Sequence, residues 1–180
     1  MMNQPDSLPV LFRISEMVAK CSDLEEAMQS VMDAFAGELG ILQAMLTVLN
    51  RNSSRIYLEV AHGLTDEQKE RGKYKIGEGI IGEVVKTGSP VMVPHISDEP
   101  RYLNKTRSTV KHDDDDSFLC VPIKAKNQVL GALSVKLRFD PARSLPQEIQ
   151  RLTIIASIFA RLVRSRQDKI EDLEKLHYAH

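Results

Sequence analysis

The stretch from Tyr74 to Lys136 decides the fold. It opens with YKIGEGIIGEVVKTGSPVMVPHI (residues 74–96) and closes with FLCVPIKAKNQVLGALSVK (residues 118–136). Glycine permits positive φ and close backbone approach, so the opening segment predicts a strand end, a tight turn and a short helix that stops at Gly88. A brief extended run, VMV, follows and is stopped by Pro94. The closing segment predicts two strands joined at Lys126-Asn127-Gln128, which is a hairpin with a short loop.

A long polar loop, residues 95–117, separates the short strand from the hairpin. Loops of this length inside a compact domain are often lids or binding loops. This one interleaves cations with polar side chains: Arg101, Tyr102, Asn104, Lys105, Thr106, Arg107, Ser108 and Lys111. Such a segment can supply donors for an anionic ligand, because arginine binds carboxylates in a bidentate manner. A flexible surface loop without a ligand explains the same composition, and the residues alone leave both interpretations open.

The same loop carries consecutive carboxylates, Asp113 to Asp116. Adjacent carboxylates have poor geometry for chelating Mg²⁺ or Ca²⁺, and no EF-hand spacing surrounds them. The run therefore predicts a solvated, mobile segment rather than a metal site.

Hydrophobic spacing before this stretch predicts helices and a further hairpin. The predicted elements are a helix over residues 7–20, a helix from the capping box at Ser22 to about residues 37–40, strands Gln43–Asn50 and Arg55–His62, and a short helix from the capping box at Thr65 to Arg71. These elements place an α+β domain around the glycine-rich stretch.

A last helix begins at Ser144, with Pro146 in its first turn. Its apolar residues recur in alternating steps of three and four, which is a heptad pattern. Up to Val163 the apolar stripe is broad enough to cover a sheet, and beyond it the stripe narrows among charges, as in a coiled-coil stalk. The heptads from Ile149 to Leu173 would otherwise expose a long apolar seam, so we expect a parallel homodimer whose stalk leads into a further domain.

Composition limits the function classes. The 180 residues carry a net charge of −1, with 42% hydrophobic and 27% charged residues, which suits one globular domain with a helical extension. This balance gives no general attraction to nucleic acid or anionic membranes. No apolar run reaches membrane-spanning length and no signal peptide precedes the domain, so a cytoplasmic location is expected. Cys21 and Cys120 are isolated, which predicts neither a disulfide framework nor a metal site.

A search for catalytic motifs finds no GxSxG, HExxH or P-loop pattern. Gly77, Gly79 and Gly82 match the spacing of the dinucleotide fingerprint, but the helix that follows is too short for a βαβ unit. We therefore predict no catalytic residue, no metal and no cofactor.

With this layout of a glycine-rich turn, a polar loop and a closing hairpin, the chain resembles a GAF domain. The resemblance implies a central antiparallel sheet, helices from both chain ends on one face, and a ligand pocket under the loops on the other. Cyclic-nucleotide-binding members carry an Asn-Lys…Phe…Asp-Glu signature; Asn104-Lys105 and Phe118 match its first half, but Pro122 and Ile123 stand at the acidic pair. Bilin-attaching members need a pocket cysteine, and sulfoxide-reducing members need more cysteines than this chain has.

Three segments resemble the N-terminal GAF domain of NifA-type activators more closely: IGEGIIGEVVKTGSPVMVPHISDEPRYLNKT (76–106), SFLCVPIKAKNQVLGALSV (117–135) and LTIIASIFARLVRSR (152–166). That family activates nitrogen-fixation genes together with sigma-54 RNA polymerase. Its GAF domain precedes and controls an AAA+ ATPase and a helix-turn-helix domain. Some members respond to 2-oxoglutarate and others to regulatory partner proteins. Relatives for vanadium and iron nitrogenases carry an N-terminal cysteine cluster, where this chain has only Cys21, so no iron–sulfur centre is expected.

The resemblance also implies a division of the chain and a site. Residues 1–20 are predicted to be an N-terminal dimerisation helix, residues 21–163 the GAF sensor domain, and residues 164–180 the start of a coiled-coil linker. If the ligand is a dicarboxylate, Arg101 or Arg107 should clamp one carboxylate, since an unpaired carboxylate loses its hydration in a closed cavity. The predicted ligand-binding residues are Arg101, Tyr102, Asn104, Thr106, Arg107 and Phe118.

Other functions stay open at this stage. The domain could serve a histidine kinase or a cyclic-nucleotide-responsive protein, or be a sulfoxide-reductase-type enzyme. It could also be a structural dimerisation module in which side chains fill the space beneath the loop.

Overall fold

An antiparallel sheet organises the part of the chain that the computed structural model describes, residues 7–20, 24–108 and 115–178. The sheet has six strands in the order β3-β2-β1-β6-β5-β4. The strands are β1 Ile41–Asn50, β2 Arg55–His62, β3 Lys73–Lys75, β4 Val91–Val93, β5 Asp116–Ala125 and β6 Gln128–Arg138. Both predicted hairpins, β1–β2 and β5–β6, are present and lie next to each other, because β1 also pairs with β6.

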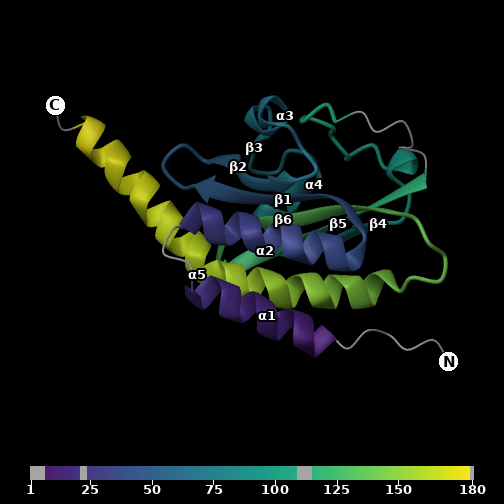
Figure 1. The fold of residues 1–180 in the computed structure, drawn as a ribbon. Coiled ribbons are helices and arrows are strands. Elements are labelled where there is room, and N and C mark those ends of the chain that lie inside the picture. The colour runs from purple at the N-terminus through teal and green to yellow at the C-terminus, as the bar shows by residue number, and fades with distance from the viewer. Residues whose placement is uncertain (1–6, 21–23, 109–114, 179–180) are drawn as a thin grey trace.

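Helices from both ends of the chain cover one face of this sheet (Figure 1). Helices α2 Leu24–Leu39 and α5 Leu145–Tyr178 lie on the sheet, and α1 Ser7–Lys20 packs against these two helices on the side away from the sheet. Their apolar residues meet those of the sheet in one buried core, with Phe35 and Phe159 both fully buried. The α+β layering predicted from the sequence is confirmed.

A second apolar core lies on the opposite face, under helix α4 Gly79–Thr87. Helix α3 Asp66–Glu70 and the 3-10 turn η1 Ile96–Asp98 lie on this side as well. Helix α4 leads from β3 to β4, which are the two opposite edges of the sheet. This is no parallel βαβ unit, so the dinucleotide fingerprint is only a coincidence of glycine spacing.

Local sequence signals explain where these elements begin and end. The predicted capping box at Thr65 is present, with Thr65 and Gln68 each bonding the other's backbone N–H. Helix α4 ends at Gly88, whose φ of 67° is the left-handed conformation that glycine adopts without strain. The predicted capping box at Ser22 and the isolated Cys21 lie outside the described residues.

The start of β5 corrects the interpretation of the acidic run. Asp113 and Asp114 lie outside the described residues, and Asp115 is exposed as predicted. Asp116, however, is fully buried as the first residue of β5. Its backbone is in register with Arg138 of β6, and its buried carboxylate faces a cation, with Oδ2 3.4 Å from Lys136 Nζ.

The second half of α5 stays attached to the domain beyond Val163. Gln167 is buried and its Nε2 donates to the backbone carbonyl of Leu49. Asn50 Nδ2 donates to Glu174 Oε1 at 2.8 Å, in the turn that joins β1 to β2. The segment predicted as a stalk therefore begins packed on the sheet, while Leu173 and Leu176 are exposed.

Candidate functional site

A small pocket lies between the polar loop, helix α4 and the sheet. Its lining residues come from β1, β3, α4, β5 and the loop: Gln43, Met45, Tyr74, Ile80, Ile81, Tyr102, Leu103, Asn104, Thr106 and Phe118. At most about one water molecule fits inside, because side chains fill most of the space beneath the loop. A larger ligand therefore needs the loop or these side chains to move.

Aromatic and aliphatic side chains form one half of the pocket. Tyr102 from the loop meets Phe118 of β5 edge to face, with ring centroids 5.0 Å apart. Tyr74 of β3 is buried beside them, and its burial is the largest cause that raises the pKa of its hydroxyl. That hydroxyl stays protonated at neutral pH and can donate a hydrogen bond to a ligand.

Polar side chains form the other half and tie the loop to strand β1. Ser108 Oγ donates to Gln43 Oε1 at 3.1 Å. The Ser108 N–H donates to Asn104 Oδ1 at 3.2 Å, and Thr106 Oγ1 donates to the same oxygen at 3.4 Å. Thr106 and Ser108 are both buried. The loop is thus held down by hydrogen bonds that a ligand's polar groups could replace.

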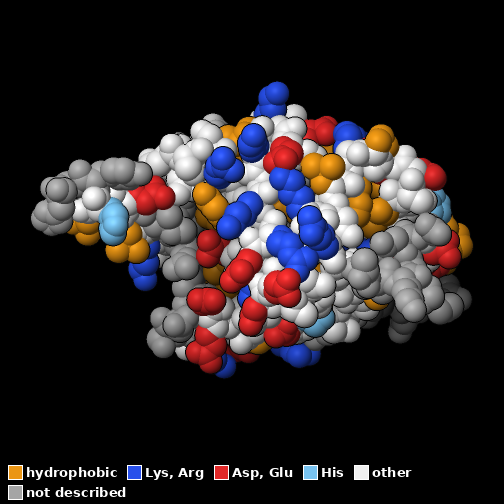
Figure 2. Space-filling model, turned by 90° about the horizontal axis from the view of Figure 1, so that it is seen from above, with side chains coloured by type: hydrophobic (Ala, Val, Ile, Leu, Met, Phe, Trp, Pro, Cys, Tyr) orange, Lys and Arg blue, Asp and Glu red, His pale blue; other side chains and the backbone are white. Residues whose placement is uncertain are grey.

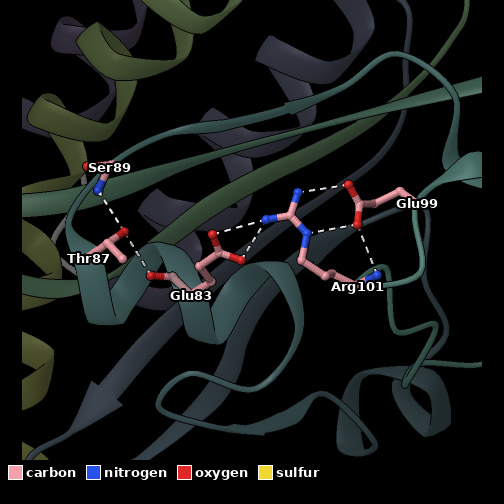
Figure 3. A network of polar contacts seen from close by, with 5 residues as sticks. All are labelled: Glu83, Thr87, Ser89, Glu99 and Arg101. Carbon is pink, nitrogen blue, oxygen red and sulfur yellow. Dashed lines mark hydrogen bonds and ion pairs between the residues drawn. The ribbon is translucent and has the colours of Figure 1, made fainter.

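Arg101 belongs to a different network, on the outer side of the loop (Figure 3). Its guanidinium donates to Glu83 of α4, with Nη1–Oε2 2.8 Å, and to Glu99, with Nε–Oε1 2.8 Å. The hydrogen bond from the Arg101 side chain is the main reason why the pKa of Glu99 falls to about 2. The Glu99 carboxylate is therefore ionised at neutral pH, and Glu83 and Glu99 together surround the Arg101 guanidinium.

The other two cations in the described part of the loop, Lys105 and Arg107, face an acidic partner or solvent. Figure 2 shows Lys and Arg side chains gathered on this face, with Asp and Glu beside them. Lys105 Nζ lies 2.6 Å from Glu78 Oε1. Arg107 is exposed, with a φ of 52°.

The structure brings four of the six predicted ligand-binding residues together. Tyr102, Asn104, Thr106 and Phe118 line the pocket. Arg101 and Arg107 are exposed and are not among the described residues that line it. Binding of a ligand by these residues stays a prediction.

Sequence reasoning missed a buried charged pair on the same face of the sheet. Lys136 Nζ lies 3.4 Å from Asp116 Oδ2, and the two side chains are 2% and 0% exposed. Alternation along β6 puts Ala132, Ser134 and Lys136 on one face and the larger aliphatic residues on the other. That pattern suggests a solvated face, and only the covering loop and helix α4 reveal that it is buried.

The described residues offer little to a catalytic or metal-dependent reaction. No group of three or more His, Cys, Asp or Glu side chains in them could hold a metal ion. Cys120 is fully buried in β5, and burial raises the pKa of its thiol, which suppresses the reactive thiolate. No helix within the described ranges is long and apolar enough to cross a membrane.

The family model and the similar known proteins agree on the family of this chain. Residues 21–164 match the GAF domain family. The nitrogen fixation proteins VnfA and AnfA of Azotobacter vinelandii are 36% and 32% identical, over 88% and 94% of this chain and 31% of each relative. A Nif-specific regulatory protein of Herbaspirillum seropedicae is 31% identical over 87% of the chain and 29% of its own length. The chain thus spans about three tenths of these relatives.

Solved structures show the same fold at low sequence identity. The A. aeolicus NLH2 GAF domain in an inactive state superposes with a TM-score of 0.76 at 20% identity, covering 89% of this chain and 96% of that one. Free methionine-R-sulfoxide reductase of Neisseria meningitidis, in complex with its substrate, gives 0.73 at 17% identity, covering 93% and 97%. The fold by itself therefore does not identify a function, since one of the proteins that share it is an enzyme.

Proposed function

Because this chain belongs to the GAF domain family and is homologous to part of the Nif-specific regulatory proteins, we propose that it is a regulatory domain that senses a small molecule. In this proposal it controls an output domain, of the ATPase and DNA-binding type that the resemblance implies, through helix α5. The ligand to which the resemblance points is 2-oxoglutarate, and a regulatory protein partner is a further possibility.

One observation carries the proposal: a single strand connects the pocket to the helix that leaves the domain. Gln43 and Met45, in the first half of β1, line the pocket. Leu49 and Asn50, at the end of the same strand, hold α5 through Gln167 and Glu174. A shift of β1 on ligand binding would move the residues that hold α5.

Calorimetric titration of the domain with 2-oxoglutarate and cyclic nucleotides tests the sensing role. Leu103→Trp enlarges a partly exposed side chain at the pocket, so it should abolish saturable binding without burying extra volume in the core. Met92→Trp is the matched control, since Met92 is similarly exposed and is not a lining residue. Equal binding by both variants would place the ligand elsewhere.

We further propose that the domain is a homodimer that pairs along α5. The exposed side chains of Leu173 and Leu176, 67% and 66% accessible, would be covered by a second copy of the helix. Leu173→Glu should halve the mass measured by light scattering at tens of micromolar protein. Phe159 is unsuitable for this test, because it is fully buried within one protomer and its replacement by Glu would unfold the domain.

The filled pocket favours a second candidate, a structural dimerisation module that binds no small molecule. In that case no compound in the titration would bind, and Leu103→Trp would leave every measured property unchanged. A sulfoxide-reductase-type activity would instead appear as thiol-dependent turnover, which the buried Cys120 does not favour.

A further inference from the structure

The buried pair Lys136–Asp116 lies directly beside the pocket. Lys136 of β6 is in register with Gln43 of β1 on one side and with Phe118 of β5 on the other. Residues opposite each other in antiparallel strands point to the same face, so Lys136 lies in one row between two residues that line the pocket. Asp116, two residues before Phe118, belongs to the same face.

Several buried oxygen atoms near this pair have no hydrogen-bond partner among the described residues. Within the described residues, neither carboxylate oxygen of Asp116 accepts a hydrogen bond, and the Ser134 hydroxyl has no partner. The 3.4 Å separation from Lys136 Nζ is long for a charge-assisted hydrogen bond. Buried polar groups are almost always satisfied, and an exception often marks a place for a water, an ion or a ligand.

A buried ion pair by itself also contributes little to the stability of the folded state. Removing two charges from water costs more than their attraction returns unless additional hydrogen bonds satisfy both, and apolar residues in their place are often equally stable. Asp116 lacks those additional bonds among the described residues, so its retention points to another role.

We propose that Lys136 and Asp116 form the charged end of the ligand site, and that the site takes a small zwitterion, an α-amino acid with an apolar side chain. This inference rests on the proposed sensing function and names the class of its ligand. The carboxylate of the amino acid accepts from Lys136 Nζ, and its ammonium donates to Asp116. The apolar side chain lies against Ile80, Ile81 and Tyr102.

Charge balance favours a zwitterion over a dicarboxylate. A dicarboxylate would bring two negative charges next to the Asp116 carboxylate, where Lys136 is the one buried cation among the described residues. The cations in the described part of the loop do not supply the missing charge, because Arg101 is bound to Glu83 and Glu99, Lys105 is bound to Glu78, and Arg107 is exposed. A zwitterion brings no net charge into the closed site, and its ammonium supplies the hydrogen-bond donor that the Asp116 carboxylate lacks among the described residues.

Entry of the ligand requires the loop to open. The Ser108–Gln43 hydrogen bond brings the loop onto the row that contains Lys136. The Tyr102–Phe118 contact closes the pocket beside it. Separating these two contacts would connect the pocket to the charged pair.

Calorimetry on the whole chain tests the proposal, with L-leucine, L-methionine and L-phenylalanine as probes and 2-oxoglutarate and cyclic AMP alongside. At least one amino acid should bind, and analogues of L-leucine that lack one charge, 4-methylpentanoate and isoamylamine, should bind roughly tenfold to a hundredfold more weakly. These analogues probe the pair in the unaltered protein, so the result does not depend on how a variant folds.

The double variant Lys136→Met, Asp116→Leu provides the second arm, since it removes both charges together and avoids leaving one unpaired. It should retain the circular dichroism spectrum and lose amino-acid binding. Binding retained in the folded double variant, or equal binding of the one-charge analogues, overturns the zwitterion site. Binding of 2-oxoglutarate or cyclic AMP without any amino acid overturns it as well but upholds the sensing function, whereas no binding by any probe refutes both.

Discussion

Gln167→Ala should destabilise the domain through one buried contact between helix α5 and the sheet. Gln167 is 1% exposed and its Nε2 donates to the Leu49 carbonyl, which is itself within a buried part of β1. Loss of the amide leaves that carbonyl without this donor, at a cost of about 1–3 kcal/mol. Deleting a buried methylene adds about 0.8 kcal/mol. Removal of Oε1, which has no partner among the described residues, offsets part of this.

The net loss of unfolding free energy should therefore be about 2 kcal/mol. For a domain of this size that corresponds to a fall of roughly 4–8 °C in melting temperature. Thermal denaturation followed by circular dichroism measures this fall, at one fixed protein concentration because the proposed dimerisation would shift the transition. Lys169→Ala is the matched control, since Lys169 is an exposed residue of the same helix and its replacement changes helix propensity by a similar small amount.

Equal melting temperatures for Gln167→Ala and Lys169→Ala would refute this reasoning. That result would mean that the helix beyond Val163 is a free stalk, as the heptad spacing alone suggests. A fall confined to Gln167→Ala would show that the start of the linker is part of the folded domain. Control of an output domain would then act on a helix that the sheet already holds.

Three further outcomes are expected. Arg101→Ala should raise the pKa of Glu99 from about 2 towards 4.5, which carboxyl NMR titration measures, and an unchanged pKa would contradict the pairing. Because the folded-state pKa is lowered, the stabilisation by this pair is present above pH 4.5 and is lost as the pH falls towards 2. Cys120 should resist iodoacetamide at pH 8 until the protein is unfolded, because burial raises the pKa of its thiol; peptide mapping that finds it labelled in the native state would argue against its burial. Gly131→Ala should lower the free energy of unfolding, measured by urea denaturation, by about 3 kcal/mol or more, because the new Cβ would lie 1.9 Å from the Thr47 carbonyl oxygen and push β1 away from β6. A decrease below about 1 kcal/mol would contradict this and show that the strands separate easily.

Contacts between residues close in the chain could be predicted from the sequence. The capping box at Thr65, the helix stop at Gly88 and the β5–β6 hairpin each depend on a few neighbouring residues and their backbone preferences. The placement of the terminal helices on one face of the sheet and of a pocket under the loops on the other came from the family resemblance. Tyr102 and Phe118 were predicted together because the resemblance placed the loop over the sheet.

Only the tertiary structure decided how charged and polar side chains are used. Alternation along β6 shows that Ser134 and Lys136 share a face, but it cannot show whether that face meets water or a loop from elsewhere in the chain. Arg101 is bound by Glu83, and Gln167 by Leu49, across separations in sequence that no local spacing encodes. The free energy of a charge depends on its partners and its exposure, and both are set by long-range contacts. The sequence by itself therefore determined the scaffold of this domain, and the fold determined which of its charges are buried.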